Sequence, residues 1–450
     1  MDSSNPCAAH FWQLYEQHKC AGLNKAQLQS DDVERCLNDI FQSSSLPMVK
    51  TVLGNSNLGK PINWVAVGKG KTPILCWSQM HGDESTATAA LLDILQTINA
   101  NSSEAWVTQL LNQVTLHIVP MLNPDGAHHL TRENHQGIDI NRDAYQLQSP
   151  EANYLKKLLD DVHPDFAFNL HDQSRYYAVG NTGKHVVLAF MAPPGDHAET
   201  QSKHRLVAMQ LIASSLKAFA PQLDGHVAKY LDGYSIKAFG DYASSQGVAT
   251  ILIESGEGPM DPNRQLARRL NFAVLMHSFH LIASTDLSSL QGQEGHYFDL
   301  PTNRENGLVD LIIRNLQIDS PSGPCRVDVA LKYCQQHLAN RIVQIGDLSG
   351  IGAFVEFNAQ GAHYDEGKTF CVEQPFDLTE QAYRRLLTQG YCRFEGDIAL
   401  IKQLSPWPII QGVGHAQPSE FMRQQHQPNW LIRDEHKVIA AVLNGELVTL

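Results

Sequence analysis

The stretch Gln79-Met80-His81-Gly82-Asp83-Glu84 lies between an expected buried strand and an expected amphipathic helix. Residues 73–77 (Pro-Ile-Leu-Cys-Trp) form an apolar run typical of a strand, and from residue 85 onward apolar residues recur at helical spacing. His81 and Glu84 are therefore placed three residues apart at a strand-to-helix turn, where an imidazole and a carboxylate reach one point in space. Such a pair suits Zn²⁺, which binds N and O ligands.

The His-x-x-Glu pattern alone is weak evidence for a metal site. With 21 histidines in the chain, about one such pair is expected by chance at ordinary Glu frequencies. A second pair does occur, at His363 and Glu366, within a turn-like stretch that has no matched third ligand. We predict that this second pair is non-catalytic.

The composition is that of an ordinary globular protein, with 43% hydrophobic and 18% charged residues. The net charge of −13 argues against nucleic acid or an anionic membrane surface as a partner, because both require concentrated Lys and Arg. No run approaches the length of a membrane span, and the N-terminus has no basic leader followed by an apolar segment. The eight cysteines are scattered without a Cys-x-x-Cys motif, which favours reduced thiols in a cytoplasmic protein.

The order of expected elements divides the chain into four parts. Residues 1–47 form a helical N-terminal segment, and residues 48–285 alternate strands with helices, which predicts an α/β domain with a largely parallel or mixed sheet. Residues 286–306 lose periodicity and are predicted to be a linker. Residues 307–450 contain short β-type runs and form a second, mainly β domain.

Polar residues follow the apolar strands of the α/β part, where functional groups gather in such folds. His81, Glu84 and His171 would supply two imidazoles and a carboxylate to Zn²⁺, leaving a fourth position open, which is the pattern of a catalytic site. Glu254 comes directly after a buried apolar strand, where an unpaired charge is costly. A carboxylate at that place fits a general base better than a surface ion pair.

Residues 131–142 supply two guanidiniums and an amide, from Arg132, Arg142 and Asn141. Arginine is suited to bidentate binding of a carboxylate. Arginine pairs are common on protein surfaces, so this observation gains weight only in combination with the others.

In that combination the sequence resembles the zinc metallocarboxypeptidases related to carboxypeptidase A, over residues 48–285. The resemblance rests on the order in which the motifs occur: His81-x-x-Glu84, Asn123-Pro-Asp-Gly126, Arg132, Asn141-Arg142, His171 and Glu254. It implies a mixed eight-stranded sheet sandwiched by helices, with one Zn²⁺ per chain.

The resemblance also implies roles for the residues. The zinc ligands would be His81, Glu84 and His171, the general base Glu254 and the oxyanion-stabilising cation Arg132. The terminal carboxylate of the substrate would be held by Asn141 and Arg142. For the tyrosine of the family's flexible loop, Tyr234 is the best match, although its spacing is one residue short and Tyr230 and Tyr242 compete with it.

The C-terminal part has a faint resemblance to the β-sandwich domain of amidohydrolases, carried by residues 309–318, 341–350 and 437–448. About 145 residues cannot hold the barrel that such a domain flanks. The resemblance implies a structural module for homo-oligomerisation or substrate gating, and an unrelated β domain is the alternative.

The sequence thus predicts a cytoplasmic zinc-dependent carboxypeptidase acting on a peptide or peptide-like substrate with a free C-terminal carboxylate, without nucleic acid or membrane as a partner. One alternative is a zinc amidoacid deacylase of the aspartoacylase or succinylglutamate desuccinylase type, which shares the metal ligands. A second is a non-catalytic binding protein with a vestigial metal site. The presence of Glu254 and Arg132 speaks against the second alternative, because a dead site needs neither a base nor an oxyanion donor.

Overall fold

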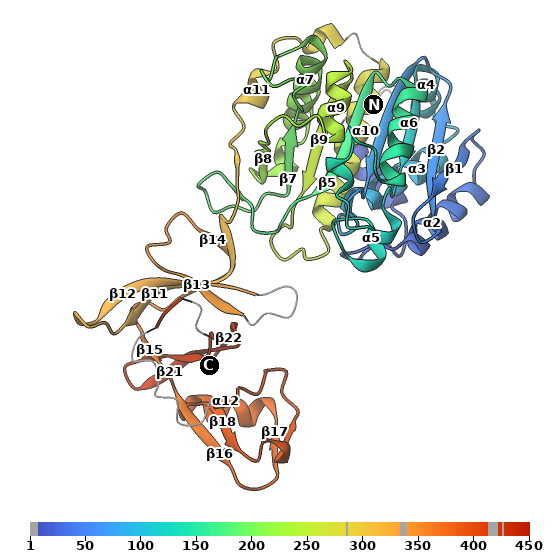
Figure 1. The fold of residues 1–450 in the computed structure, drawn as a ribbon. Helices are drawn as coiled ribbons and strands as arrows, with labels where there is room; N and C mark the ends of the chain where they lie inside the picture. The colour runs from blue at the N-terminus through green and yellow to red at the C-terminus, as the bar shows by residue number, and fades with distance from the viewer. Residues whose placement is uncertain (1–7, 285–286, 334–339, 413–421, 425–426) are drawn as a thin grey trace. The chain divides into compact units, whose positions relative to one another are not determined.

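A computed structural model describes residues 8–284, 287–333, 340–412, 422–424 and 427–450 of the chain. Its contacts define two compact units (Figure 1). The first unit comprises Met1–Gly180 and Lys184–Glu305, and the second comprises Asn181–Gly183 and Asn306–Leu450. Each unit has its own sheet and its own hydrophobic core.

An eight-stranded sheet with the order β1-β2-β4-β3-β5-β9-β7-β8 forms the centre of the first unit. Its strands are β1 (Val49–Asn55), β2 (Pro61–Gly68), β3 (Thr72–Ser78), β4 (Val114–Val119), β5 (Phe166–Asp172), β7 (Leu188–Met191), β8 (Val227–Lys229) and β9 (Ala249–Ser255). The central strands β4, β3, β5 and β9 run parallel, whereas β1, β2 and β7 pair antiparallel with their neighbours. The prediction of a mixed eight-stranded sheet is confirmed.

Helices cover both faces of this sheet (Figure 1). The cluster on one face includes residues of α1 (Ala8–His18), α2 (Ser30–Gln42), α3 (Thr86–Ala100), α4 (Ala105–Gln113), α7 (Lys203–Ala218) and α10 (Gln265–Ser284). The cluster on the other face includes residues of α6 (Pro150–Val162) and α9 (Phe239–Ser245). Shorter elements are α5 (Pro124–His129), α8 (Ala220–Leu223), α11 (Gly295–Phe298), the 3₁₀ turns η1 (Ile140–Arg142) and η2 (Leu287–Leu290), and the strand pair β6 (Ala178–Val179) and β10 (Asn303–Arg304).

The strand β5 shows how the sequence sets these two faces. Side chains alternate between the faces of a strand, so that Phe166, Phe168 and Leu170 enter the cluster under α3 and α10 while Ala167 enters the cluster under α6 and α9. By the same alternation His171 lies on the face of Ala167. The functional side chain therefore emerges at the strand end on the side that α6 and α9 cover.

The second unit is mainly β, as predicted. Its main sheet joins β11 (Leu308–Ile318), β12 (Cys325–Lys332), β13 (Arg341–Gly346), β14 (Gly352–Asn358), β15 (His363–Asp365), β20 (Trp430–Asp434), β21 (Lys437–Leu443) and β22 (Glu446–Thr449). Two small sheets pair β16 (Lys368–Val372) with β18 (Tyr391–Gly396) and β17 (Phe376–Leu378) with β19 (Ile401–Gln403), and a 3₁₀ turn, η3, spans Ile398–Leu400.

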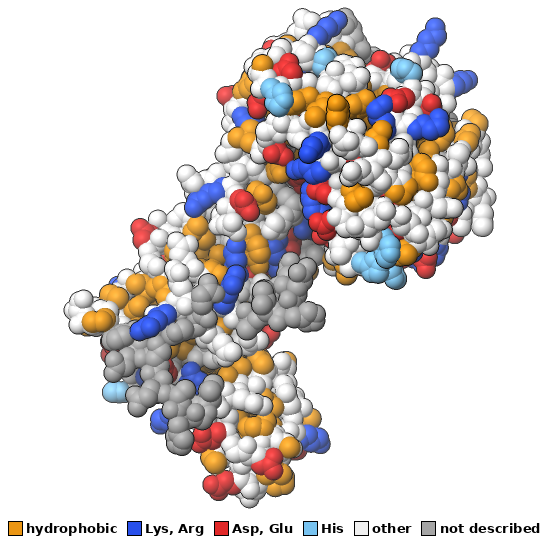
Figure 2. Space-filling model, in the orientation of Figure 1, with side chains coloured by type: hydrophobic (Ala, Val, Ile, Leu, Met, Phe, Trp, Pro, Cys, Tyr) orange, Lys and Arg blue, Asp and Glu red, His pale blue; other side chains and the backbone are white. Residues whose placement is uncertain are grey.

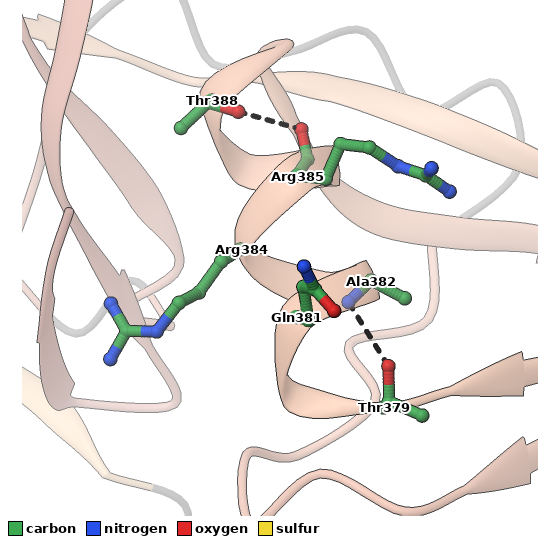
Figure 3. A pocket seen from close by; sticks show the side chains of 6 residues that line it. All are labelled: Thr379, Gln381, Ala382, Arg384, Arg385 and Thr388. Atoms are coloured by element: carbon green, nitrogen blue, oxygen red, sulfur yellow. Dashed lines mark hydrogen bonds between the residues drawn. The ribbon is translucent and has the colours of Figure 1, made fainter.

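One helix, α12 (Glu380–Thr388), belongs to the second unit. Thr379 caps it, since its hydroxyl accepts a hydrogen bond from the Ala382 amide at 3.1 Å. One side of the helix buries Tyr383 and Leu387, and the other lines a surface pocket that carries Arg385 (Figure 3). The buried side of the helix joins a hydrophobic cluster that also contains residues of β16, β17 and β18 from the small sheets and of β20, β21 and β22 from the main sheet.

The surface carries charges of both signs, and blue and red side chains are interspersed on the face that Figure 2 shows. None of the helices in the described ranges is both long and apolar enough to cross a bilayer.

Candidate active site

The turn between β3 and α3 is held in place by the backbone and side chains that pack against it, independently of any ligand. A Cβ at Gly82 would lie 1.9 Å from the carbonyl carbon of Gly126, so only glycine fits where these two backbones pass. Asn123 holds both segments, because its side chain donates to the Met80 carbonyl at 3.1 Å and accepts from the Gly126 amide at 2.8 Å. The Asn-Pro-Asp-Gly motif therefore positions the turn that presents His81.

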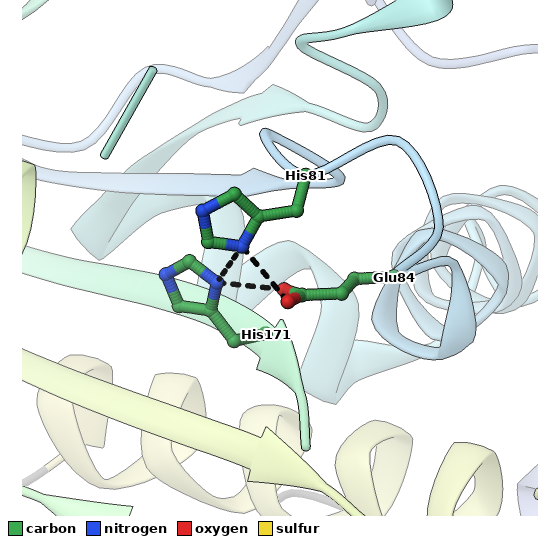
Figure 4. A group of neighbouring side chains, drawn as sticks. All are labelled: His81, Glu84 and His171. Carbon is green, nitrogen blue, oxygen red and sulfur yellow. Dashed lines mark hydrogen bonds and ion pairs between the residues drawn. The ribbon is translucent and has the colours of Figure 1, made fainter. Parts of the chain in front are cut away.

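Three side chains converge at this turn and at the end of β5 (Figure 4). The Nδ1 atoms of His81 and His171 lie 3.2 Å apart, and each lies 2.8 Å from an oxygen of Glu84. All three residues are buried. In the ranges that the structure describes, this is the one group of three such ligands close enough to hold a metal ion.

The donor set fits Zn²⁺. Two imidazole nitrogens that face each other at 3.2 Å beside a carboxylate are arranged for a shared cation rather than for hydrogen bonds with one another. Two His and one Glu leave one coordination position open, as in catalytic zinc sites. The predicted ligands His81, Glu84 and His171 are thus brought together as a zinc site.

The outer nitrogen of His81 is fixed by a residue to which the sequence analysis gave no role. His81 Nε2 donates to Asp139 Oδ1 at 3.1 Å, and this bond leaves Nδ1 free for a metal ion. Asp139 Oδ2 also accepts from Arg132 Nε at 3.0 Å. A ligating histidine usually has such a carboxylate partner, but spacing along the sequence did not point to Asp139, which lies 58 residues from His81.

Charges within the group shift its pKa values strongly. Burial alone would lower the pKa of His81, but the Glu84 and Asp139 carboxylates outweigh it and raise that pKa to about 9. Burial would raise the pKa of Glu84, yet His81 and His171 hold it well below its usual range. The three ligand side chains therefore form a compact, charged cluster that is shielded from solvent.

Glu254 stands directly beside the metal ligands. It pairs in register with His171 across the parallel strands β5 and β9, so that both side chains point to the same face of the sheet. It is 8% exposed, and burial followed by the nearby Glu84 charge raises its pKa well above the ordinary value. A buried carboxylate with an elevated pKa beside a metal site is suited to accept a proton.

Arg132 reaches the same group from the rim. Its Nη1 lies 3.2 Å from His81 Nδ1 and 3.5 Å from Glu84 Oε1, while its side chain stays 41% exposed. The bond to Asp139 fixes the guanidinium at this position. A substrate carbonyl at the ligand cluster would therefore meet a fixed cation.

Asn141 and Arg142 follow within η1, whose first residues are capped by Asp139 through the Asn141 amide at 2.9 Å. The Asn141 side chain lies 3.4 Å from His171 Nε2 and accepts from the Phe239 amide at 3.0 Å. Arg142 is 46% exposed, donates from Nη1 to the Asn141 carbonyl at 2.9 Å and approaches Asp232 only to 3.8 Å. Part of its guanidinium therefore faces solvent, one residue away from Asn141, whose side chain lies beside His171.

The tyrosines near the site fall into two groups: some contact other side chains, and others lie within electrostatic reach of Glu254. Tyr234 stacks edge-on against His197, with ring centroids 4.7 Å apart, and Tyr242 lies under the Lys156 ammonium. Tyr230 is largely buried, and burial followed by the Glu254 charge raises its pKa. Tyr177 is also within electrostatic reach of Glu254. The assignment of Tyr234 as the substrate-binding tyrosine stays a prediction.

Fold and site together place a His-Glu-His group suited to Zn²⁺ and a buried carboxylate at the carboxyl ends of the parallel strands of an α/β sheet. Residues 34–157 match the family model described as zinc carboxypeptidase, which confirms the predicted resemblance.

Individual relatives share limited parts of the sequence. Carboxypeptidase SOL1 of Arabidopsis thaliana is 25% identical over 179 residues, which are 36% of this chain and 36% of that protein. The gamma-D-glutamyl-L-diamino acid endopeptidase 1 of Lysinibacillus sphaericus is 31% identical over 106 residues, 22% of this chain and 27% of that protein. The matched parts span 18% to 37% of the length of curated relatives such as these.

Among solved structures, carboxypeptidase A from Helicoverpa armigera superposes with a TM-score of 0.47 at 14% identity. The superposition covers 61% of this chain and 80% of that one.

Proposed function

We propose that the protein is a zinc-dependent metallocarboxypeptidase that hydrolyses the C-terminal amide bond of a peptide or peptide-like substrate. The observation that carries this proposal is the register pair of His171 and Glu254, which sets a buried carboxylate beside the three metal ligands. A zinc ion held by His81, Glu84 and His171 supplies a Lewis acid and lowers the pKa of water.

The residues around this centre have distinct tasks. Glu254 accepts the proton of the attacking water and then delivers it to the leaving amine, which its desolvated position and raised pKa support. Arg132 faces the carbonyl oxygen as negative charge develops there, and a fixed donor at that point is worth about 3–4 kcal/mol.

Recognition of the substrate terminus falls to Arg142 and Asn141. Arg142 is 46% exposed, and although its Nη1 donates to the Asn141 carbonyl at 2.9 Å, its Nη2 has only a long contact of 3.8 Å with Asp232. A terminal carboxylate would replace this loose contact with a bidentate pair. The requirement for a free C-terminus follows directly.

The test is hydrolysis of a blocked dipeptide by the zinc-loaded protein. A blocked dipeptide with a free C-terminal carboxylate should be cleaved, and the same peptide with a C-terminal amide should not. Cleavage of an N-acyl amino acid in place of the dipeptide would favour the amidoacid deacylase alternative. Equal cleavage of the acid and the amide would contradict the role of Arg142.

Two further expectations belong to the proposal. A cytoplasmic location is proposed from the scattered cysteines, and homo-oligomerisation is proposed for the second unit. Fractionation of cells and light scattering of the purified chain test them separately.

A further inference from the structure

Asp172, the residue after the metal ligand His171, binds the segment that carries the metal ligand Glu84. Its Oδ2 atom accepts a hydrogen bond from the Thr86 amide at 3.1 Å and another from the Thr86 hydroxyl at 2.7 Å. Its backbone amide donates to Glu84 Oε2 at 3.2 Å. Asp172 therefore holds Glu84 twice, directly through its amide and indirectly through the first residue of α3.

A cation from a third segment contacts the same carboxylate. Arg264 lies directly before α10, and its Nη1 donates to the Ser255 carbonyl at 2.9 Å and lies 3.5 Å from Asp172 Oδ2. Ser255 follows Glu254 in β9 and is the register partner of Asp172 in β5. Arg264 thus connects the ends of two neighbouring strands at the position where each strand presents a functional side chain.

This ion pair lies where charges are costly to place. The side chains of Asp172 and Arg264 are 6% and 20% exposed, and the attraction between two such charges only partly offsets the loss of their hydration. The backbone of Arg264 has a φ of 53°, in the left-handed region that is unfavourable for a residue with a Cβ. An unfavourable backbone conformation combined with a desolvated ion pair points to a geometric role more than to a gain in stability.

The metal centre needs such a contact because its side chains come from separate elements. Glu84 belongs to the turn before α3, His171 to β5 and Glu254 to β9. Functional groups of this kind must be held within about 0.5 Å of their productive geometry by residues that are themselves fixed by packing and hydrogen bonds. The pair of Asp172 and Arg264 joins the ends of α3, β5 and β9, so it can fix these separations together.

We propose that Asp172 and Arg264 are positioning residues, which set the distances between the metal ligands and the neighbouring general base. They act through Glu84, α3 and β9 and do not belong to the ligand group themselves. The part of the inference that concerns zinc binding depends only on the His-Glu-His group. The part that concerns Glu254 rests on the proposed carboxypeptidase function.

The first experiment measures zinc affinity by competition with a chelator of known affinity. Asp172→Asn keeps the size of the side chain but removes the charge that holds Arg264, so zinc affinity should fall by about 10-fold. Arg264→Gln should lower the affinity in the same way. Arg264→Lys should regain most of it, because an ammonium has donors enough for both the Ser255 carbonyl and the Asp172 carboxylate.

Arg269→Gln is the matched control. Arg269 also lies at the start of α10 and is 22% exposed, but it bonds to Glu16 at 2.8 Å and to the Trp12 carbonyl at 2.7 Å, away from the metal ligands. Its substitution should leave zinc affinity unchanged. Unchanged affinity in Arg264→Gln, or an equal loss in Arg269→Gln, would overturn the proposal. Should Asp172→Asn not fold, Arg264→Gln and its lysine counterpart carry the test.

Cobalt substitution separates positioning from a general loss of stability. The visible absorption of bound Co²⁺ depends on the arrangement of its ligands. Arg264→Gln should therefore alter the spectrum of the cobalt-loaded protein, whereas Arg269→Gln should keep the parent spectrum. Both spectra are recorded at a temperature at which circular dichroism shows folded protein. A parent-like spectrum in Arg264→Gln would contradict the proposal.

Hydrolysis of the blocked dipeptide reports on Glu254. At saturating zinc, Arg264→Gln should lower kcat by about 10-fold, since a displaced base costs rate, with little change in KM because the proposed carboxylate-binding residues lie on another segment. A kcat equal to that of the parent would overturn the part that concerns Glu254. Absence of all hydrolysis in the parent, with the zinc and cobalt differences intact, would defeat only the carboxypeptidase proposal.

Discussion

The same four-residue pattern occurs twice in this chain, once in each unit, with opposite outcomes. His81 and Glu84 are 1% and 9% exposed and meet His171 from a neighbouring strand. His363 is exposed at the start of β15, and within the described ranges neither it nor Glu366 belongs to a group of three side chains that could hold a metal ion. The difference teaches that burial and a third ligand, rather than the spacing, create the metal site.

A second contrast concerns one ion pair in each unit. In the first unit Arg268 bonds to Asp93 at 2.7 Å, and the side chains are 2% and 0% exposed. In the second unit Arg433 bonds to Asp365 at 2.6 Å, and the side chains are 27% and 28% exposed. Because the two ion pairs have similar N–O distances but differ in solvent exposure, comparing them tests how much burial changes the contribution of an ion pair to stability.

The largest expected effect comes from the carboxylate that has no equivalent in the second unit. Glu254→Gln keeps the shape of the side chain but removes the base, so hydrolysis of the blocked dipeptide should fall by about 10²- to 10⁴-fold. Zinc content and circular dichroism should stay as in the parent protein. Glu366→Gln is the control and should leave kcat/KM unchanged; equal activity of the two variants would refute the proposed mechanism.

The next effect in size is on stability. Arg268→Ala leaves the Asp93 carboxylate buried without its cation, which should lower the free energy of unfolding of the first unit by about 3–5 kcal/mol. Arg433→Ala breaks a partly hydrated pair and should cost about 0–1 kcal/mol. Urea denaturation followed by tryptophan fluorescence measures both, and similar losses would show that burial does not distinguish the pairs.

A substitution of Asp139 tests how much zinc binding in the first unit depends on a residue that is not itself a metal ligand. Asp139→Asn weakens the fixed orientation of His81, so zinc affinity should drop by about 10- to 100-fold. Competition with a chelator of known affinity gives the value. Asp365→Asn, in the second copy of the pattern, should leave zinc binding unaltered, and a matching loss in that variant would point to a general effect of charge.

The sequence predicted the central sheet and the three metal ligands because these depend on local patterns. Helix α6 shows such a local pattern: it begins at Pro150 behind Ser149, whose hydroxyl accepts from the Ala152 amide at 3.2 Å. The 20-residue helix α10 was not predicted, since it is buried on most sides and lacks a single apolar stripe.

The rest of the site depends on contacts between segments that are distant in sequence. The bond of Asp139 to a histidine 58 residues away is invisible to spacing arguments, as is the approach of Tyr230 and Tyr177 to Glu254.

The smallest expected effect concerns a buried carboxylate outside the metal cluster. The folded protein holds the pKa of Asp241 at about 7, against an ordinary value near 3.8, mainly because the group is desolvated. The folded state therefore binds this proton more tightly than the unfolded state. The stability it contributes is complete below about pH 4 and is lost as the pH rises through 7.

Asp241→Asn should remove this component. Relative to the variant, the parent protein should lose on the order of 1–2 kcal/mol of unfolding free energy between pH 5 and pH 8. Urea denaturation at several pH values provides the comparison. Parallel curves for the two proteins would mean that Asp241 is solvated in the folded state. The difference in burial between the His81–Glu84 pattern and the His363–Glu366 pattern would then apply to the metal ligands and Glu254 but not to Asp241.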